Sequence, residues 1–269
     1  MLSFLLLTQT ASVDTSGLFA IANHGQVLLV RRVEALFAII PAEHAAKGKM
    51  PSRWQRLPKP LLGAMPYRSG FMVYEEKGDL LLVQGQKPPT KLAGPIPKTM
   101  PQLPLQWFGL DRRSRPYLYV NRGGDTTLSG LVILEHGKWL VYKGDPMPIP
   151  KSFSARMYGE NSVGRTDKGL WFPNVRNRAY FVPNEKLGGA HGAVEISTTD
   201  PSLRAYAVRT NDFTHYVLVT IRGSRILLGR FRGDTYLDPR RCFLASDDRF
   251  VDYQYGDHGD RMIVSRVRR

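Results

Sequence analysis

The sequence predicts an all-β fold with under about 10% of its residues in helices. Short runs rich in Val, Ile, Leu, Tyr and Phe alternate with glycine-containing turns, as at residues 26–30, 79–83, 131–134, 216–221 and 225–228. No apolar stripe with helical spacing continues for three turns. A parallel sheet flanked by helices is therefore not expected.

The best helical candidate is the segment 33–40, which ends before Pro41 because proline cannot continue a helix. Its β-branched and aromatic residues also favour a strand. Two proline-rich stretches, 41–69 and 84–104, are expected to be long surface loops, since the range that contains both holds 11 of the 19 prolines. Proline removes a backbone donor, so neither stretch can supply a central strand.

Composition restricts the class of protein. Of 269 residues, 42% are hydrophobic, which is enough for a folded core and excludes global disorder. The single cysteine, Cys242, excludes an internal disulfide and a cysteine-rich zinc site. No apolar run approaches the roughly 20 residues of a membrane-spanning helix.

The net charge is +15, from 38 basic and 23 acidic residues. Such an excess favours a nucleic acid or an anionic surface as the partner. The basic residues are spread over the chain, so a solvated basic surface is the simpler interpretation. The densest clusters are Arg112, Arg113 and Arg115; Arg240 and Arg241; and Arg266, Arg268 and Arg269 near the C-terminus.

A turn motif recurs along the chain: a polar residue, a basic residue and glycine, followed by an apolar run. Its glycines are Gly25, Gly78, Gly137, Gly169, Gly223 and Gly259. Glycine accepts a positive φ without steric cost, so each copy predicts a tight hairpin. Together with a looser Arg-Thr repeat, the motif divides the chain into units that begin near 18, 70, 105, 161, 205 and 244.

These units average about 45 residues, close to the length of a propeller blade. We therefore expect one β-propeller-like domain over residues 17–269, with about six antiparallel blades. A β-sandwich or another multi-sheet all-β fold uses similar strands and turns and remains the alternative.

One stretch of the chain resembles a known family. The segment from Asp167 to Phe172, Asp-Lys-Gly-Leu-Trp-Phe, is similar to the Asp-x-Gly-x-Leu-Trp core of two-component regulator propeller repeats. The resemblance is best over about 130–182. It implies an extracytoplasmic propeller that senses or binds a ligand.

The N-terminal segment 1–16 has two interpretations. Residues 2–7 form an apolar run, which could be the remnant of a secretory signal or a strand that closes the fold. The first favours an extracytoplasmic location over a cytoplasmic one. The second follows from the last unit, which reads as three strands, one short of a blade. In that case residues 2–7 dock next to 264–267.

Three residues are candidates for ligand binding. Arg165 and Arg209 share an Arg-Thr string before a turn, which predicts equivalent positions near the mouth of a central channel and an affinity for anions. Trp54 lies in a proline-rich stretch between Arg53 and Arg56, and an exposed indole there could stack on a sugar, a base or an aromatic group.

The sequence favours a non-enzymatic propeller that serves as a binding or scaffold module for a protein or an anionic ligand. The histidines and acidic residues lack metal-ligand spacing, so no metal or cofactor is expected. A carbohydrate-active hydrolase or lyase is the first alternative, and a nucleic-acid binder the second. An enzyme would use converging acids from the set Glu75, Asp111, Asp167, Asp212 and Asp248, which turn capping explains more simply.

Overall fold

The computed structural model describes residues 17–76, 78–97, 107–111, 113–122, 125–143, 150, 163–173, 178–189, 192–211, 215–232, 237–238, 241–256 and 259–269. Within these ranges the fold is all-β, as expected. The helices are two single turns, α1 (Ala42–Ala45) and α2 (Asn184–Leu187). No helix in the described ranges has the length and apolar character needed to cross a bilayer.

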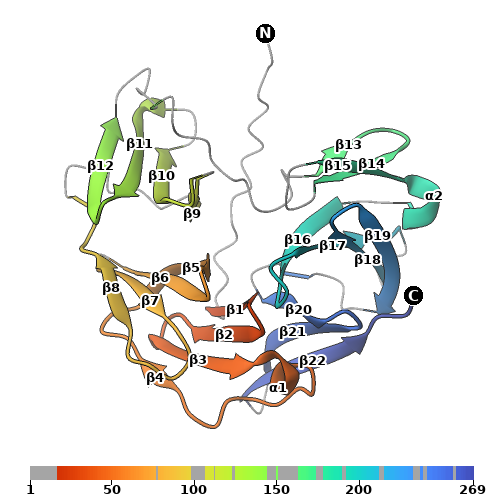
Figure 1. Cartoon of the computed structure of the whole chain (residues 1–269), viewed down its shortest axis with the longest axis horizontal. Coiled ribbons are helices and arrows are strands. Elements are labelled where there is room, and N and C mark those ends of the chain that lie inside the picture. The colour runs from red at the N-terminus through yellow and green to blue at the C-terminus, as the bar shows by residue number, and fades with distance from the viewer. Residues whose placement is uncertain are drawn as a thin grey trace. The chain divides into compact units, whose positions relative to one another are not determined.

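The strands form six consecutive meanders, in which neighbours along the chain are neighbours in a sheet (Figure 1). The first is β1 (Leu18–Asn23), β2 (Gln26–Arg31), β3 (Leu36–Pro41) and β4 (Gln55–Arg56). The second is β5 (Leu61–Tyr67), β6 (Gly70–Glu75), β7 (Leu80–Val83) and β8 (Thr90–Ala93). The third is β9 (Trp107–Leu110), β10 (Pro116–Arg122), β11 (Asp125–Glu135) and β12 (Lys138–Lys143).

The remaining meanders are shorter or joined. The fourth is β13 (Gly164–Arg165), β14 (Gly169–Pro173) and β15 (Ala179–Pro183). The fifth is β16 (Gly192–Thr198), β17 (Leu203–Arg209), β18 (His215–Arg222) and β19 (Arg225–Arg232), and the sixth is β20 (Cys242–Ser246), β21 (Arg249–Gly256) and β22 (Gly259–Arg266). The last two form one seven-stranded sheet, because β16 and β20 pair in parallel over two residues each.

The chain forms two compact units. Unit 1 comprises residues 1–17 and 93–156 and contains the third meander, whose core includes Tyr117, Leu131 and Ile133. Unit 2 comprises residues 18–92 and 157–269 and contains the other five meanders.

Within unit 2 each neighbouring pair of meanders shares an apolar core. The cluster between the first and second includes Val30, Phe37, Phe71 and Val73. The cluster between the fifth and sixth includes Ala205, Phe231, Leu244 and Phe250, and that between the fourth and fifth includes Phe172, Val182, Tyr206 and Val217. The fourth and sixth meanders therefore cover the two faces of β16–β18, and the second meander covers one face of β1–β3.

The first meander also packs on the sixth, although they are far apart in the sequence (Figure 1, red and blue). Their shared cluster contains Leu18, Ala20, Val27, Phe243 and Val251. In unit 2 the sheets are therefore stacked in the order second, first, sixth, fifth and fourth. Burial on both faces explains why so many strands are continuously apolar rather than alternating.

The helix prediction for 33–40 is wrong. Residues 36–41 form β3, which pairs with β2 from Leu36 opposite Arg31 to Pro41 opposite Gln26. Phe37 and Ile39 pack on the second meander, while Ile40 packs on the sixth. Because both faces are covered, the segment has no alternation, and a short apolar run alone does not separate a strand from a buried helix.

The two proline-rich stretches are not entirely loops. The first contains α1, β4 and β5, and the second contains β8. All three strands are at the edge of their sheets, where a missing backbone donor is tolerated. The three strands that lie within the described part of these stretches are thus edge strands.

Four of the six turn glycines have the expected positive φ: Gly25, Gly137, Gly223 and Gly259. Gly78 and Gly169 do not. Gly169 has another reason to be glycine, since a Cβ there would collide with the carbonyl oxygen of Val182 on β15.

Four of the six predicted unit starts lie within three residues of a first strand. The other two, near 70 and 205, fall on second strands, because β5 and β16 precede them. The last meander has three strands, as expected. The segment 1–16, with residues 2–7, lies outside the described residues.

Candidate functional site

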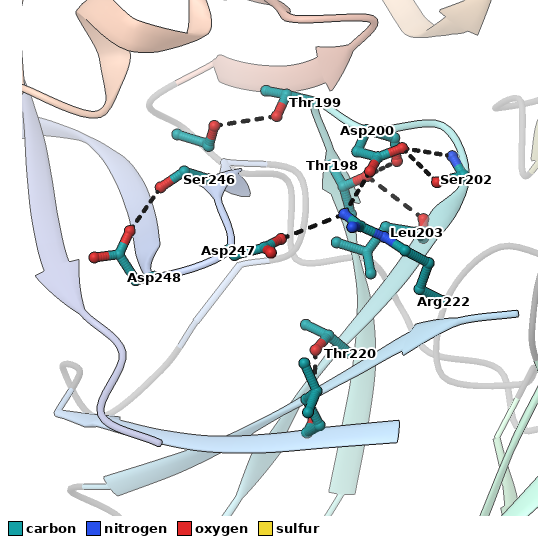
Figure 2. Close-up of polar contacts among 12 residues, drawn as sticks. Thr198, Thr199, Asp200, Ser202, Leu203, Thr220, Arg222, Ser246, Asp247 and Asp248 are labelled. Carbon is teal, nitrogen blue, oxygen red and sulfur yellow. Dashed lines mark hydrogen bonds and ion pairs between the residues drawn. The ribbon is translucent and has the colours of Figure 1, made fainter. Parts of the chain in front are cut away.

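A group of polar side chains joins the turns of the fifth and sixth meanders (Figure 2). The Nη2 atom of Arg222, at the end of β18, lies 2.6 Å from Oδ2 of Asp200 and 3.6 Å from Oδ1 of Asp247. Asp200 also accepts hydrogen bonds from the backbone N–H and the hydroxyl of Ser202. We call Asp200, Ser202, Arg222 and Asp247 the turn cluster.

Burial opposes the charged form of Asp200, but the Ser202 hydrogen bonds and the Arg222 charge outweigh it and lower the pKa of this carboxyl group. The side chain of Arg222 is 52% exposed and that of Asp200 is 37% exposed. The adjacent Thr199 donates its N–H to Leu244 and its hydroxyl to Ala245, and accepts the N–H of Gly25 through its carbonyl. Thr199 and the turn cluster therefore hold turns of three meanders together, and the charges of the turn cluster already have partners.

Four exposed arginines lie at the outer strands of the fifth and sixth meanders. They are Arg230 and Arg232 on β19, Arg266 at the end of β22 and Arg268 beyond it. We call these four the basic edge. None of them forms an ion pair with a carboxylate in the described part of the chain.

The basic edge is held by backbone pairing. Arg230 donates its N–H to the carbonyl of Arg268 at 2.7 Å and accepts the N–H of Arg268 at 2.9 Å. The two residues are thus directly opposite in an antiparallel bridge. Two like charges opposite each other on neighbouring strands destabilise the pairing. A bound anion would relieve that repulsion.

A pocket of about 350 Å³ opens between β19 and the face of β21 and β22 that packs toward it. Its apolar wall contains Leu237, Phe250 and Ile263, and its polar groups belong to Arg232, Asp252, Gln254 and Ser265. On β21 the lining residues alternate, at 250, 252 and 254, and on β22 they are the opposite partners 263 and 265. The sheet register therefore places all five on one face.

The inner wall of the pocket carries a buried carboxylate. Asp252 is 5% exposed, its Oδ2 accepts a hydrogen bond from Nε2 of Gln254, and its Oδ1 lies 3.5 Å from the thiol of Cys242. Burial raises the pKa of the Cys242 thiol, and the charges of Asp252 and Asp238 add to this effect, while Arg241 opposes it. Cys242 is thus a buried residue of the core whose thiol is protonated.

A second ion pair links the first and last meanders. Nε of Arg31, on β2, lies 2.6 Å from Oδ2 of Asp260, on β22, and the hydroxyl of Tyr253 donates to the same oxygen. Burial opposes the charge on Arg31, but hydrogen bonds to Asp260 and Glu34 raise its pKa. Burial and the hydrogen bond to Asp260 raise the pKa of Tyr253.

Of the predicted binding residues, Arg165 and Arg209 take similar local but different overall positions. Each is the last paired residue before a hairpin, and the next residue, Thr166 or Thr210, bonds across the turn through both its N–H and its hydroxyl. Arg165 is on β13, the first described strand of its sheet, whereas Arg209 ends β17, the second strand of its sheet in the described order. The two arginines thus share a turn geometry, and their position at a channel mouth stays a prediction.

Trp54 is partly buried rather than fully exposed. It packs against the core shared by the first and sixth meanders, and the guanidinium of Arg31 lies 4.8 Å from its ring centroid. The exposed aromatic pair is elsewhere. Trp171 and Phe181 are opposite each other on β14 and β15, 43% and 39% exposed, with ring centroids 5.2 Å apart. The sequence motif at 167–172 contains Trp171 but not Phe181, so it does not predict the pair.

The acidic candidates have different surroundings. Asp111 is fully buried, accepts the N–H groups of Arg113 and Arg115, and forms an ion pair with the Arg115 side chain. Glu75 accepts the N–H groups of Lys59 and Asp79. Both cap turns. Asp167 is exposed in a turn and Asp248 is half exposed, whereas Asp212 lies outside the described residues.

Among the described side chains no group of three or more His, Cys, Asp or Glu residues could hold a metal ion. No protein-family model matches the sequence, and comparison with curated proteins finds no similar one. The features that bear on function are therefore the basic edge, the pocket and the exposed aromatic pair.

Proposed function

We propose that the chain is a propeller-type binding module that recognises an acidic protein segment through the basic edge. The fold part of this proposal is supported by the stacking in unit 2, where apolar cores join the second meander to the first, the first to the sixth, the sixth to the fifth and the fifth to the fourth. Up-and-down meanders stacked in chain order, with the first against the last, are the pattern of propeller blades. An experimental structure in which the meanders form a two-layer sandwich would refute it.

The single observation that carries the binding part is the opposed pair Arg230 and Arg268. Arginine presents a rigid planar fork of donors that matches a carboxylate in bidentate geometry. Four such side chains on adjacent strands, with no described carboxylate as partner, form a site that can bind several carboxylates at once. An acidic peptide supplies them at the spacing of an extended chain.

A protein partner is favoured over a nucleic acid. Proteins that bind single strands place aromatic side chains beside the basic groove so that bases can stack. The exposed large hydrophobic residues in the described ranges are Val33, Leu140, Trp171 and Phe181, none of which is on β19 or β22. The basic edge thus offers charge without a stacking surface.

The test measures fluorescence anisotropy of a labelled poly-glutamate peptide. The double variant Arg230→Gln, Arg268→Gln should weaken its binding by about tenfold or more, which corresponds to about 1.4 kcal/mol. Arg165→Gln, which removes an exposed arginine on β13, is the matched control and should leave the affinity unchanged. Added salt should weaken wild-type binding, because the contact is between exposed charges.

The same titration with a single-stranded oligonucleotide distinguishes the partner classes. Tighter binding of the oligonucleotide than of the peptide, at equal salt and charge, would refute an acidic protein as the partner. Loss of peptide binding in Arg165→Gln alone would instead move the anion site to β13, where the sequence first suggested it.

A second candidate function is carbohydrate binding, favoured by the pair Trp171 and Phe181. Exposed aromatic faces stack on sugar rings, and Arg165 on the neighbouring strand β13 adds a charged donor. Quenching of tryptophan fluorescence by neutral and acidic oligosaccharides tests it. Trp171→Ala should abolish the quenching, whereas Trp139→Phe, on β12, should retain it.

A further inference from the structure

The outer edge of β19 presents backbone groups of alternate residues. Arg230 donates its N–H to the carbonyl of Arg268 and accepts the N–H of Arg268, so both of its backbone groups point away from β18. Alternate residues of a strand point these groups to the same side, so Ile226 and Leu228 point theirs to the outer edge as well. The register of β18 with β19 is continuous over all of β19, so nothing interrupts this alternation.

Two side-chain hydrogen bonds agree with these directions. On the outer side, the hydroxyl of Ser265 donates to the carbonyl of Arg232 at 3.3 Å. On the inner side, the hydroxyl of Thr220, on β18, donates to the carbonyl of Leu227 at 3.4 Å. The even-numbered residues of β19 therefore face outward with their backbone groups, and the odd-numbered residues face β18.

The outer edge is paired at one position and open before it. Arg268 pairs with Arg230, where the C-terminus lies beside β19 (Figure 1). Within the described ranges no strand pairs with Ile226 or Leu228 on the outer side. Their side chains are partly buried against the core of the fourth and fifth meanders, which holds this part of β19 in place. Such an edge is a template on which another extended segment adds as a strand.

Arginines lie at both ends of the open part of the edge. Arg225, the first residue of β19, is exposed, and Arg230 and Arg268 lie opposite each other at the other end. Arg225 and Arg230 are on opposite faces of the strand, because side chains alternate along it. A second copy of β19 would add further arginines to this edge, and charged edge strands resist pairing with their own kind. An acidic strand instead meets a cation on each of its faces.

We infer that β19 binds an acidic segment of a partner protein as an added β-strand. The backbone of the segment pairs with Ile226 and Leu228, and its carboxylates bind Arg225 on one face and Arg230 on the other. Main-chain hydrogen bonds supply affinity in this mode, and the arginines select an acidic sequence. This inference rests on the proposed function and adds to it the conformation of the bound partner.

The experiment compares short labelled peptides of alternating glutamate and valine by fluorescence anisotropy. One is unmodified, one is N-methylated at every valine and one is N-methylated at every residue, so all carry the same charge. Methylation at every valine blocks one edge of the extended peptide, whereas full methylation blocks both. The valine-methylated peptide should bind within about threefold of the unmodified one. The fully methylated peptide should bind at least about tenfold more weakly, since it loses several backbone hydrogen bonds at once.

The outcomes separate this inference from the proposed function. Equal affinity of all the peptides overturns the added strand and leaves the proposed function intact, because binding then depends on charge alone. A loss as large for the valine-methylated peptide as for the fully methylated one also overturns the added strand. If poly-glutamate binds and none of the alternating peptides does, the added strand alone is refuted. If poly-glutamate does not bind either, both proposals fail.

Leu228→Pro makes the corresponding change on the protein. Proline removes the outward N–H of Leu228, which pairs with no backbone group in the described part of the chain, and proline is tolerated in that direction on an edge strand. This variant should bind the unmodified peptide about tenfold more weakly. Leu228→Val keeps the N–H, is the matched control and should bind normally. Unchanged binding by a folded Leu228→Pro overturns the inference; if that variant does not fold, the methylated peptides decide.

Discussion

Arg31 and Asp260 are 229 positions apart in the sequence, yet Nε of one lies 2.6 Å from a carboxylate oxygen of the other. The pair connects β2 of the first meander with β22 of the last. The Asp260 side chain is only 2% exposed, and its oxygen also receives the Tyr253 hydroxyl. The contact is therefore a buried polar link between the first and last meanders, beside the apolar cluster that they share.

Asp260→Asn should lower the free energy of unfolding by about 2–4 kcal/mol, because it removes one partner from a largely buried ion pair. Urea unfolding followed by tryptophan fluorescence measures the change. Glu34→Gln is the matched control, since Glu34 contacts the same arginine from the exposed side, and should cost under about 1 kcal/mol. Equal effects of the two variants would contradict a special role for the junction.

Asp200→Asn should make stability less dependent on pH. The folded-state pKa of Asp200 is lowered, so its contribution is fully present above the unfolded pKa of about 3.9 and is lost as pH falls through the folded value. At pH 7 the variant should be less stable by about 1 kcal/mol, and in acid, once pH falls below the folded pKa, the difference should vanish.

Asp248→Asn provides the comparison for Asp200. Its nearest arginine atom, Nε of Arg249, is 3.9 Å away and both side chains are well exposed. That variant should change the free energy of unfolding by less than about 0.5 kcal/mol at pH 7. A difference for Asp200→Asn that persists unchanged in acid would show that its charge is not the cause.

Gly169→Ala should destabilise the fourth meander by about 1–3 kcal/mol, because the new Cβ would collide with the carbonyl oxygen of Val182. Gly192→Ala, at the start of β16, meets no heavy atom within 4 Å and should be neutral or slightly stabilising. Melting temperatures of the two variants test the difference. A tolerated Gly169→Ala would mean that β14 and β15 can separate without cost.

Cys242 should be unreactive toward a thiol reagent in the native state. The reactive species is the thiolate, and both burial and the neighbouring carboxylates disfavour it. Labelling with a chromogenic disulfide should be roughly a thousandfold or more slower than in urea, since it requires unfolding. Comparable rates in the two conditions would place the thiol at an accessible surface.

The sequence predicted the all-β fold class and the three strands of the last meander. It also predicted the positive φ of four of the six turn glycines along the chain, because the conformation of a hairpin depends on neighbouring residues. It missed β5 and β16 as first strands. The start of β5, Leu61 and Leu62, lies within a proline-rich stretch, and β16 follows glycines that resemble a flexible connection. Local patterns do not show which strand begins a sheet.

The candidate sites were harder to predict for a different reason. Arg266 and Arg268 stand out in the sequence as a basic tail, but nothing near Arg230 shows that it lies opposite Arg268. The pocket likewise combines Arg232, Leu237 and residues 250–265, which come together only through the pairing of β21 with β22 and the packing of β19. Such sites arise from long-range pairing and leave no continuous motif.

The shared core of the first and last meanders has a consequence during translation. Leu18, Ala20 and Val27 are covered by Phe243 and Val251, which leave the ribosome some 200 residues later. At about 5–20 residues per second, the first sheet keeps an apolar face open to the cytosol or the secretion channel for roughly 10–45 s. The native cover of this face is therefore complete only after the final strands emerge.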